Sequence, residues 1–301
     1  MVTELSVGNG VLAYSISEKD GLKEATIEYY RGKDVAVTVP ELIEDCPVVC
    51  IGKKAFLSAK TLSRIVIPQS VRKIGDWAFA SCSRLTELVL PRKSLEIGNG
   101  VFKDCVMLEK IVLTDEVGSQ ADSDTCYLLA AAVSRLDAQY LFDTVNAGSP
   151  EWIEHFDSTT LQMLMKDDSD GFSKMLLCGE EDYVGDDSNF DTYCLMRQKD
   201  KVRMLLLRLL HSEGISSDIR ERYVAYIREN MDSVTWKVVV EEHGDEREYF
   251  DLLLDYDCIN KDNVSRLIES MGERNTGMKG YLMKVKTERM SGGGFMDELD
   301  L

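Results

Sequence analysis

The chain has few of the residues and motifs on which enzymes depend. Only three histidines occur in 301 residues, and their spacing matches neither H-E-x-x-H nor H-x-E…C-x-x-C. The G-x-S-x-G and G-x-x-x-x-G-K-[ST] motifs are absent, and no G-x-G-x-x-G follows a strand. We therefore expect no enzyme activity, no cofactor and no metal ion. An enzyme would need a concave pocket with convergent polar groups, which a structure can test.

Other absences bear on the compartment. No apolar run approaches the roughly 18 residues of a membrane span. The residues from Met1 to Gly8 have no basic segment followed by a long apolar run, as a signal peptide would. The eight cysteines are dispersed and include no C-x-x-C pair, which favours free thiols in a reducing cytoplasm. We expect a cytoplasmic protein, the alternative being a secreted or surface protein whose signal precedes Met1.

A repeat of 23 residues occupies much of the first half of the chain. Three blocks align without gaps, beginning at Ile51, Ile74 and Ile97, and each continues as I-G-x-x-[AV]-F. Each block then carries a leucine and a short apolar run with alternating character, such as Ile65-Val66-Ile67. A partial earlier unit begins at Val35, and the array ends at Thr114. A period of 20 to 29 residues is typical of leucine-rich repeats.

Each block is interpreted as one coil of a solenoid. The alternation predicts a strand in which Ile65 and Ile67 point into the coil and Val66 points outward. The glycine after each isoleucine allows a tight bend. Because a coil cannot bury its apolar face alone, both ends need caps. Residues 1–34 supply the first cap, since Val11–Ile16 and Ala25–Tyr29 are typical of a hairpin.

The run I-G-x-x-A-F-x-x-C-x-x-L-x-x-[IL]-V-[IL]-P resembles the BspA-type (Treponema-like) leucine-rich repeat over residues 35–114. The resemblance implies a right-handed solenoid that binds proteins or surface ligands and has no chemistry of its own. Many members of this family are secreted or surface-displayed adhesin-like proteins. An adhesin-like role is therefore the alternative to an intracellular interaction module.

The outward strand face is the candidate binding surface. Two columns of side chains follow from the 23-residue spacing: Arg64, Glu87 and Lys110 in one, and Val66, Val89 and Val112 in the other. The charges of the first column either pair along the ladder or flank an apolar stripe that is presented to a partner. Cys82 and Cys105 occupy equivalent positions in adjacent coils, where they are either small core residues or near disulfide distance.

The second half of the chain has helical periodicity. Val264, Leu267, Ile268 and Met271 illustrate the spacing. Residues 115–290 are therefore predicted to form a helical domain, followed by a tail over 291–301. The last two helix pairs align at an offset of about 30 residues and resemble degenerate ankyrin-type pairs, which implies partner binding. The predicted fold class is α+β: a short leucine-rich-repeat solenoid followed by an all-α ankyrin-like domain.

Acidic residues are concentrated after the repeats. The chain has a formal net charge of −18, which excludes a general nucleic-acid binder. Residues 115–191 contain 18 acidic side chains and three basic ones. This excess either keeps the protein soluble or steers a basic partner to the segment. The aspartates around 167–170 suggest a calcium loop, but Lys166 stands where the first ligand is needed. The sequence thus predicts a module that binds a protein partner, without nucleic acid or membrane contacts.

Overall fold

The computed structural model describes residues 2–19, 21–115, 124–136, 138–172 and 187–290. The chain folds as two compact units, Met1–Leu161 and Gln162–Leu301. The first unit contains the repeats and the second is helical. Among the described residues, no helix combines the length and the apolar character needed to cross a membrane.

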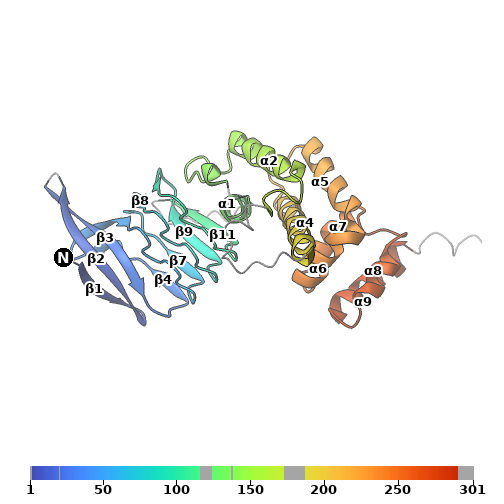
Figure 1. Cartoon of the computed structure of the whole chain (residues 1–301), viewed down its shortest axis with the longest axis horizontal. Coiled ribbons are helices and arrows are strands. Elements are labelled where there is room, and N and C mark those ends of the chain that lie inside the picture. The colour runs from blue at the N-terminus through green and yellow to red at the C-terminus, as the bar shows by residue number, and fades with distance from the viewer. Residues whose placement is uncertain (1, 20, 116–123, 137, 173–186, 291–301) are drawn as a thin grey trace, which may run out of the picture. The chain divides into compact units, whose positions relative to one another are not determined.

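A three-stranded meander begins the first unit. Strands β1 (Val2–Val7), β2 (Gly10–Lys19) and β3 (Leu22–Arg31) pair antiparallel in this order. The β2–β3 pair is the hairpin that the sequence predicts. Strand β3 then pairs in parallel with β6 (Cys46–Ile51), the first strand of the coils on this side (Figure 1). The hairpin therefore continues the sheet of the solenoid and covers its first coil.

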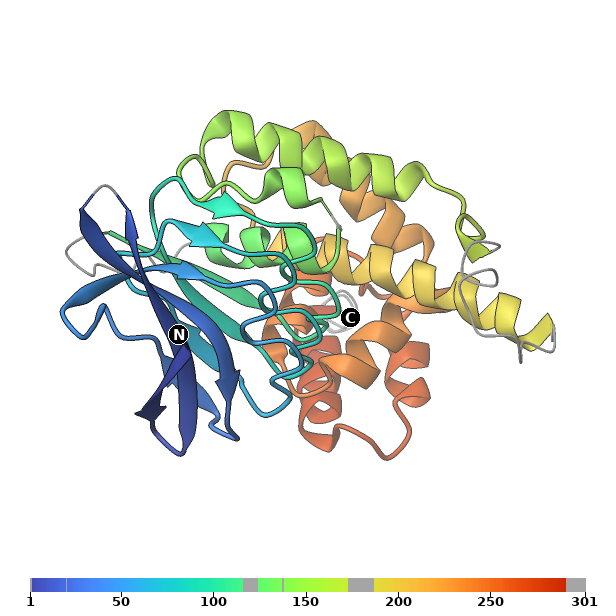
Figure 2. The ribbon, with the colours of Figure 1, turned by 60° about the vertical axis from the view of Figure 1, so that its left-hand side comes forward.

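The coils form two parallel ladders. One sheet has the order β1-β2-β3-β6-β8-β10, with β8 at Lys73–Ile74 and β10 at Glu96–Ile97, and β5 (Leu42–Ile43) pairs with β6. The other sheet has the order β11-β9-β7-β4, formed by Ala36–Thr38 (β4), Arg64–Val66 (β7), Glu87–Pro91 (β9) and Lys110–Thr114 (β11). Arg64 pairs with Glu87, and Glu87 with Lys110, so the register follows the 23-residue period. Figure 2 shows the coils lying one on another.

A column of aromatic rings runs through the core of the solenoid. Successive ring centroids lie 5.4, 5.5, 6.0 and 5.1 Å apart along the series Tyr30, Phe56, Phe79, Phe102 and Phe142. The outer two members come from the hairpin and from the segment that follows the coils. Full burial of one such side chain contributes about 1.5–3 kcal/mol, so the column stabilises the stack along its whole length.

Cys82 and Cys105 are buried thiols next to this column. The Sγ of Cys82 donates to the carbonyl of Phe56 and the Sγ of Cys105 to that of Phe79, each at 3.1 Å. Burial raises the pKa of Cys82 to about 11 and that of Cys105 to about 12. Both cysteines are free, and the interpretation as small core residues therefore holds.

The conserved spacing of glycine has a different cause from the one expected. A Cβ on Gly75 would lie 2.7 Å from the backbone nitrogen of Lys53, so adjacent coils approach too closely for any side chain. The sharp bend comes two residues later. Lys54, Trp77 and Gly100 occupy equivalent positions and have φ of 60°, 59° and 60°. The glycine is thus required for contact between coils rather than for the bend.

Helices close the end of the solenoid. Helix α1 (Asp124–Ser134) packs against β11, and η1 (Gln139–Leu141) follows it (Figure 1). Helix α2 (Pro150–Met165) contributes Trp152, whose indole nitrogen donates to the carbonyl of Leu141 at 2.8 Å. The change to helical structure falls near residue 115, as predicted. The boundary between compact units lies later, within α2, because the first helices pack on the coils.

The second unit is built from short helices after one long one. They are α4 (Asp187–Leu210), α5 (Ser217–Glu229), η2 (Met231–Thr235), α6 (Trp236–Glu242), α7 (Arg247–Asp255), α8 (Val264–Ser270), α9 (Thr276–Val285) and η3 (Lys286–Met290). The Ser216 side chain caps α5 by accepting from the amide of Ile219. This unit is the helical region that the sequence predicts.

The internal offset of about 30 residues holds for only part of this unit. Val234 and Val264 are both buried, as are Val238 and Ile268. In the second helix of each pair, the predicted partners Leu253 and Met283 differ, since Met283 is 48% exposed. Leu253 corresponds instead to the buried Leu282, at an offset of 29. The pairing of Leu253 with Met283 was wrong because a one-residue shift turns a side chain to another face of a helix.

Candidate binding surfaces

The charged column of the strand face is largely engaged within the solenoid. The Nε of Arg64 lies 2.8 Å from a carboxylate oxygen of Glu87, and these side chains are 40% and 32% exposed. The Nζ of Lys110 lies 5.0 Å from the ring centroid of Tyr127 in α1. An exposed cross-strand pair contributes roughly 0.2–1 kcal/mol. Of the two alternatives, pairing along the ladder describes Arg64 and Glu87.

The valine column is not the exposed stripe that the sequence predicts. Val89 is 3% and Val112 is 5% exposed, because Cys126 and the ring of Tyr127 from α1 pack against them. Val66, further from α1, is half-buried. The expectation that Val89 and Val112 are available to a partner is therefore corrected. Strand periodicity tells which side chains leave the coil, but not that a later helix covers them.

The part of the sheet farthest from α1 remains open. Ala36 and Thr38 of β4 are exposed, and their neighbours Arg64 and Val66 on β7 are partly exposed. Strand β4 is also the edge of its sheet, which leaves one side of its backbone without a neighbouring strand. We call Ala36, Thr38, Arg64 and Val66 the open strand face. Of the predicted binding residues, Arg64 and Val66 lie on it, and Glu87 lies beside it.

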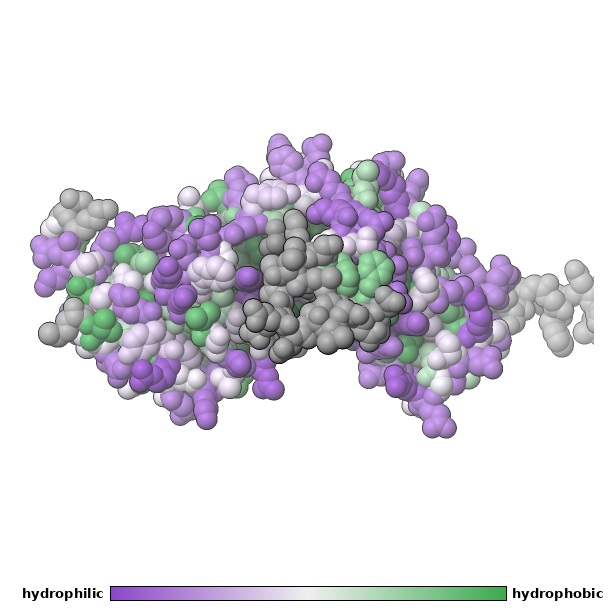
Figure 3. Space-filling view, in the orientation of Figure 1, coloured by the Kyte–Doolittle hydropathy of each residue, from purple (hydrophilic) through white to green (hydrophobic). Residues whose placement is uncertain are grey.

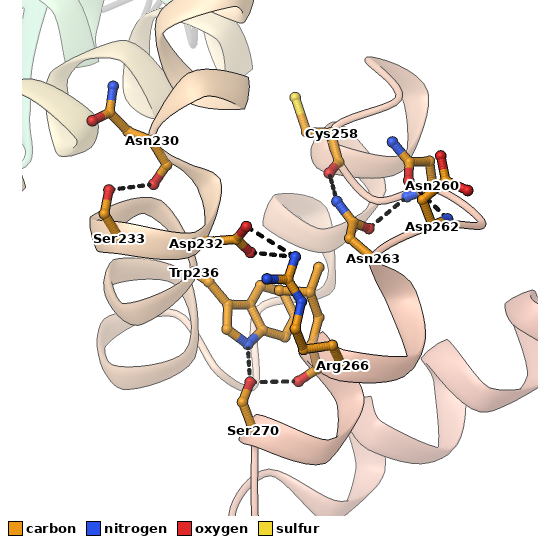
Figure 4. Close-up of polar contacts among 11 residues, drawn as sticks. Asn230, Asp232, Ser233, Trp236, Cys258, Asn260, Asp262, Asn263, Arg266 and Ser270 are labelled. Carbon is orange, nitrogen blue, oxygen red and sulfur yellow. Dashed lines mark hydrogen bonds and ion pairs between the residues drawn. The ribbon is translucent and has the colours of Figure 1, made fainter.

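A second surface lies in the helical unit. A cavity of about 540 Å³ opens between η2–α6 and α8, with an apolar floor of Trp236, Val240, Leu267 and Met271. The indole nitrogen of Trp236 donates to the Oγ of Ser270 at 2.8 Å, and this hydroxyl donates to the carbonyl of Leu267 (Figure 4). These bonds fix the indole against α8. We call this cavity the helical groove.

The rim of the helical groove carries both signs of charge. The guanidinium of Arg266 lies 2.7 Å from a carboxylate oxygen of Asp232 and links α8 to η2 (Figure 4). Lys237, Glu273 and Arg274 also line the rim. An apolar floor with a mixed polar rim suits a protein segment better than a uniformly charged ligand. Sequence periodicity marked Leu267 and Met271 as buried, but not that a groove opens beside them.

The residues considered for chemistry have structural roles. The ring of His243 stacks on Tyr249 with centroids 3.7 Å apart, and its Nδ1 lies 3.1 Å from a carboxylate oxygen of Glu246. The carboxylate of Asp167 accepts from the amide of Ser169 at 2.9 Å, which forms a local turn. Within the described part of the chain, no group of three His, Cys, Asp or Glu side chains is placed to hold a metal ion.

Hydrophilic side chains dominate the face of each unit that Figure 3 shows, with small hydrophobic patches between them. Scattered apolar residues of this kind are normal for a protein surface. In the first unit the most exposed large apolar side chains are Val35, Leu22, Leu42, Val106 and Tyr140. Val35 precedes β4 and extends the open strand face.

Comparison with known proteins agrees with the coil geometry. The family of the BspA type leucine rich repeat region matches residues 44–125, in six copies. These residues are therefore BspA-type leucine-rich repeats. Comparison with curated proteins gave no match.

Several solved structures are similar to part of the chain. A leucine-rich repeat protein of T. pallidum is 36% identical over 33% of this chain and 46% of its own, with a TM-score of 0.31. A leucine-rich cell surface protein of Faecalibacterium prausnitzii is 27% identical, over 38% and 30%, with a TM-score of 0.30. A leucine-rich repeat protein of Bacteroides capillosus is 28% identical, over 35% and 78%, at 0.31. The chain thus covers less than half of the first two proteins.

Proposed function

We propose that the chain is a non-enzymatic protein-interaction module. The observation that carries the proposal is the stack of BspA-type coils, which leaves the open strand face free on β4 and β7. Repeat solenoids present extended surfaces of this kind to partners. The contact centres on Thr38 and Val66, which are cross-strand neighbours, with Arg64 at the side.

The helical unit provides a second contact. Its groove combines a fixed indole with charges of both signs, a composition found in the core and rim of protein interfaces. We assign the helix pairs between 231 and 285 to an ankyrin-like arrangement that serves the same purpose. The partner is basic, because the acidic excess of residues 115–191 raises its association rate. This rate falls steeply with added salt if the charge steers the encounter.

Affinity capture from the native cell tests the proposal. The variant carrying Thr38→Arg and Val66→Arg changes the open strand face, while Leu22→Arg places the same charge on a residue that is 68% exposed in the hairpin. We expect a partner that the wild type and Leu22→Arg retain and that the double variant loses by about tenfold or more. Equal recovery by all three proteins would assign the contact to another surface.

Cell fractionation separates the two settings for this function. The proposal places the protein in the cytoplasm, where its thiols stay reduced. Recovery of the full-length protein in the extracellular or surface fraction would favour the adhesin-like alternative instead.

A further inference from the structure

The turn side of each coil carries a row of three backbone hydrogen bonds to the next coil. The amides of Lys54, Phe56 and Ser58 donate to the carbonyls of the second coil at 2.9, 2.7 and 2.9 Å. One coil later the amides of Trp77, Phe79 and Ser81 repeat the pattern at 2.9, 3.0 and 2.7 Å, and their acceptors are the carbonyls of Asn99, Val101 and Lys103. Donors at alternate positions therefore connect each coil to its successor.

The third coil has the same donors without a successor. Gly100, Phe102 and Asp104 occupy the equivalent positions, and no described residue accepts a hydrogen bond from their amides. The segment that follows the coils caps them by other contacts. The ring of Phe142 packs on Phe102, and the side-chain amide of Gln139 donates to the carbonyl of Gly98 at 2.6 Å. The cap replaces the core contact of a fourth coil but leaves the row of amides open.

These amides line a cavity in the first unit. Its volume is about 460 Å³, and residues Gly100 to Val106 form one wall while Val133, Ser134 and Gln139 form the other. Val106 is 75% exposed at the mouth. A backbone amide that lacks an acceptor is unfavourable unless water or a ligand supplies one. The cavity is therefore the place of a fourth coil, with its hydrogen-bond donors still unused.

We propose that this cavity binds an extended segment of a partner protein, whose main-chain carbonyls accept from Gly100, Phe102 and Asp104. Alternate carbonyls of an extended chain point the same way, which matches donors at alternate positions. The Asp104 carboxylate lines the wall and disfavours an anion. Val106 and Val133 offer apolar contact to the side chains of the segment. The proposal rests on the binding role proposed above and names a separate site for it.

A second copy of the chain does not fit as the occupant. In a head-to-tail stack, the first coil of the next copy would have to supply the carbonyls. The carbonyl of Ala55, in the middle of that row, already accepts from the amide of Tyr30 at 2.7 Å. The hairpin thus blocks the acceptor end of the ladder, and the segment must come from another protein.

Amide hydrogen exchange in the full chain gives the first test. We expect Gly100, Phe102 and Asp104 to exchange at least about tenfold faster than Trp77, Phe79 and Ser81, their equivalents one coil earlier. Equal protection of the two rows would show that the third row is already paired and would overturn the proposal.

Selection from a phage-displayed library of dodecapeptides gives the second test. Val106→Trp narrows the mouth, whereas Met107→Trp adds the same ring at a 48% exposed neighbour outside the cavity lining. We expect selected peptides to protect the three amides, and their affinity to fall about tenfold with Val106→Trp only. Peptides that bind both variants equally, a library that yields no binder, or protection by inorganic phosphate alone would overturn the proposal. The Thr38→Arg, Val66→Arg variant should leave peptide binding unchanged, which separates this site from the open strand face.

Discussion

Replacement of Gly75 by alanine should destabilise the first unit strongly. The new Cβ would lie 2.7 Å from the nitrogen of Lys53 and 2.9 Å from the carbonyl carbon of Gly52, whereas ordinary contacts begin at 3.4 Å. Relief requires the two coils to separate by about 0.7 Å locally. The hydrogen bond from the Gly75 amide to the carbonyl of Ile51, now 2.8 Å, would then stretch to about 3.5 Å, beyond normal geometry.

The expected loss follows from these distances. Weakening of the neighbouring inter-coil hydrogen bonds costs about 1 kcal/mol each, and strain from overpacking adds about 1–3 kcal/mol. We expect the free energy of unfolding to fall by about 3–5 kcal/mol and the melting temperature by about 10 °C. Gly280→Ala is the control, because its Cβ meets nothing within 4 Å and alanine favours the α9 helix.

Urea unfolding of both variants, followed by hydrogen exchange of the coil amides, measures this difference. Gly280→Ala should match or exceed the wild type, by up to about 1 kcal/mol. If Gly75→Ala were as stable as Gly280→Ala, the coils would not be held in the close contact described here.

Three further changes test other parts of the structure. Lys54→Gly should raise the free energy of unfolding by up to about 1 kcal/mol in urea titrations, because glycine adopts a φ of 60° without steric cost; a loss of stability would contradict this. Burial holds the pKa of Cys82 near 11 and that of Cys105 near 12, so their contribution is complete below pH 9 and is lost as the pH rises through these values. Stability should therefore fall between pH 9 and 11, and less so when both are alanine; identical pH profiles would refute this. Ser270→Ala should cost about 1–2 kcal/mol, seen by tryptophan fluorescence during unfolding, because it removes the acceptor of the Trp236 indole; no loss would mean the bond is not formed.

The sequence predicted the coils well because their period is local and repeated. Leu88 and Leu90 point inward and are fully buried, as alternation within the strand requires. The phenylalanine at each coil position stacks on its equivalent because the ladder keeps register. These features depend on spacing alone, which a sequence states directly.

The candidate binding site was harder to predict because it depends on contacts between distant segments. Val89 and Val112 satisfy the pattern of outward residues, yet α1 returns over them from beyond the repeats. The open amides of the third coil carry no side-chain signature, since any residue has an amide. Met283 failed as a core residue because the spacing of helix pairs shifts by one.

Site-specific photo-cross-linking tests the central claim, that the open strand face contacts a protein partner. A photoreactive amino acid replaces Thr38, which is exposed on β4, or Leu22 in the hairpin as the control. After irradiation in the native cell, we predict one discrete cross-linked protein from position 38 and none from position 22. No product from position 38, or the same products from both positions, would contradict the account.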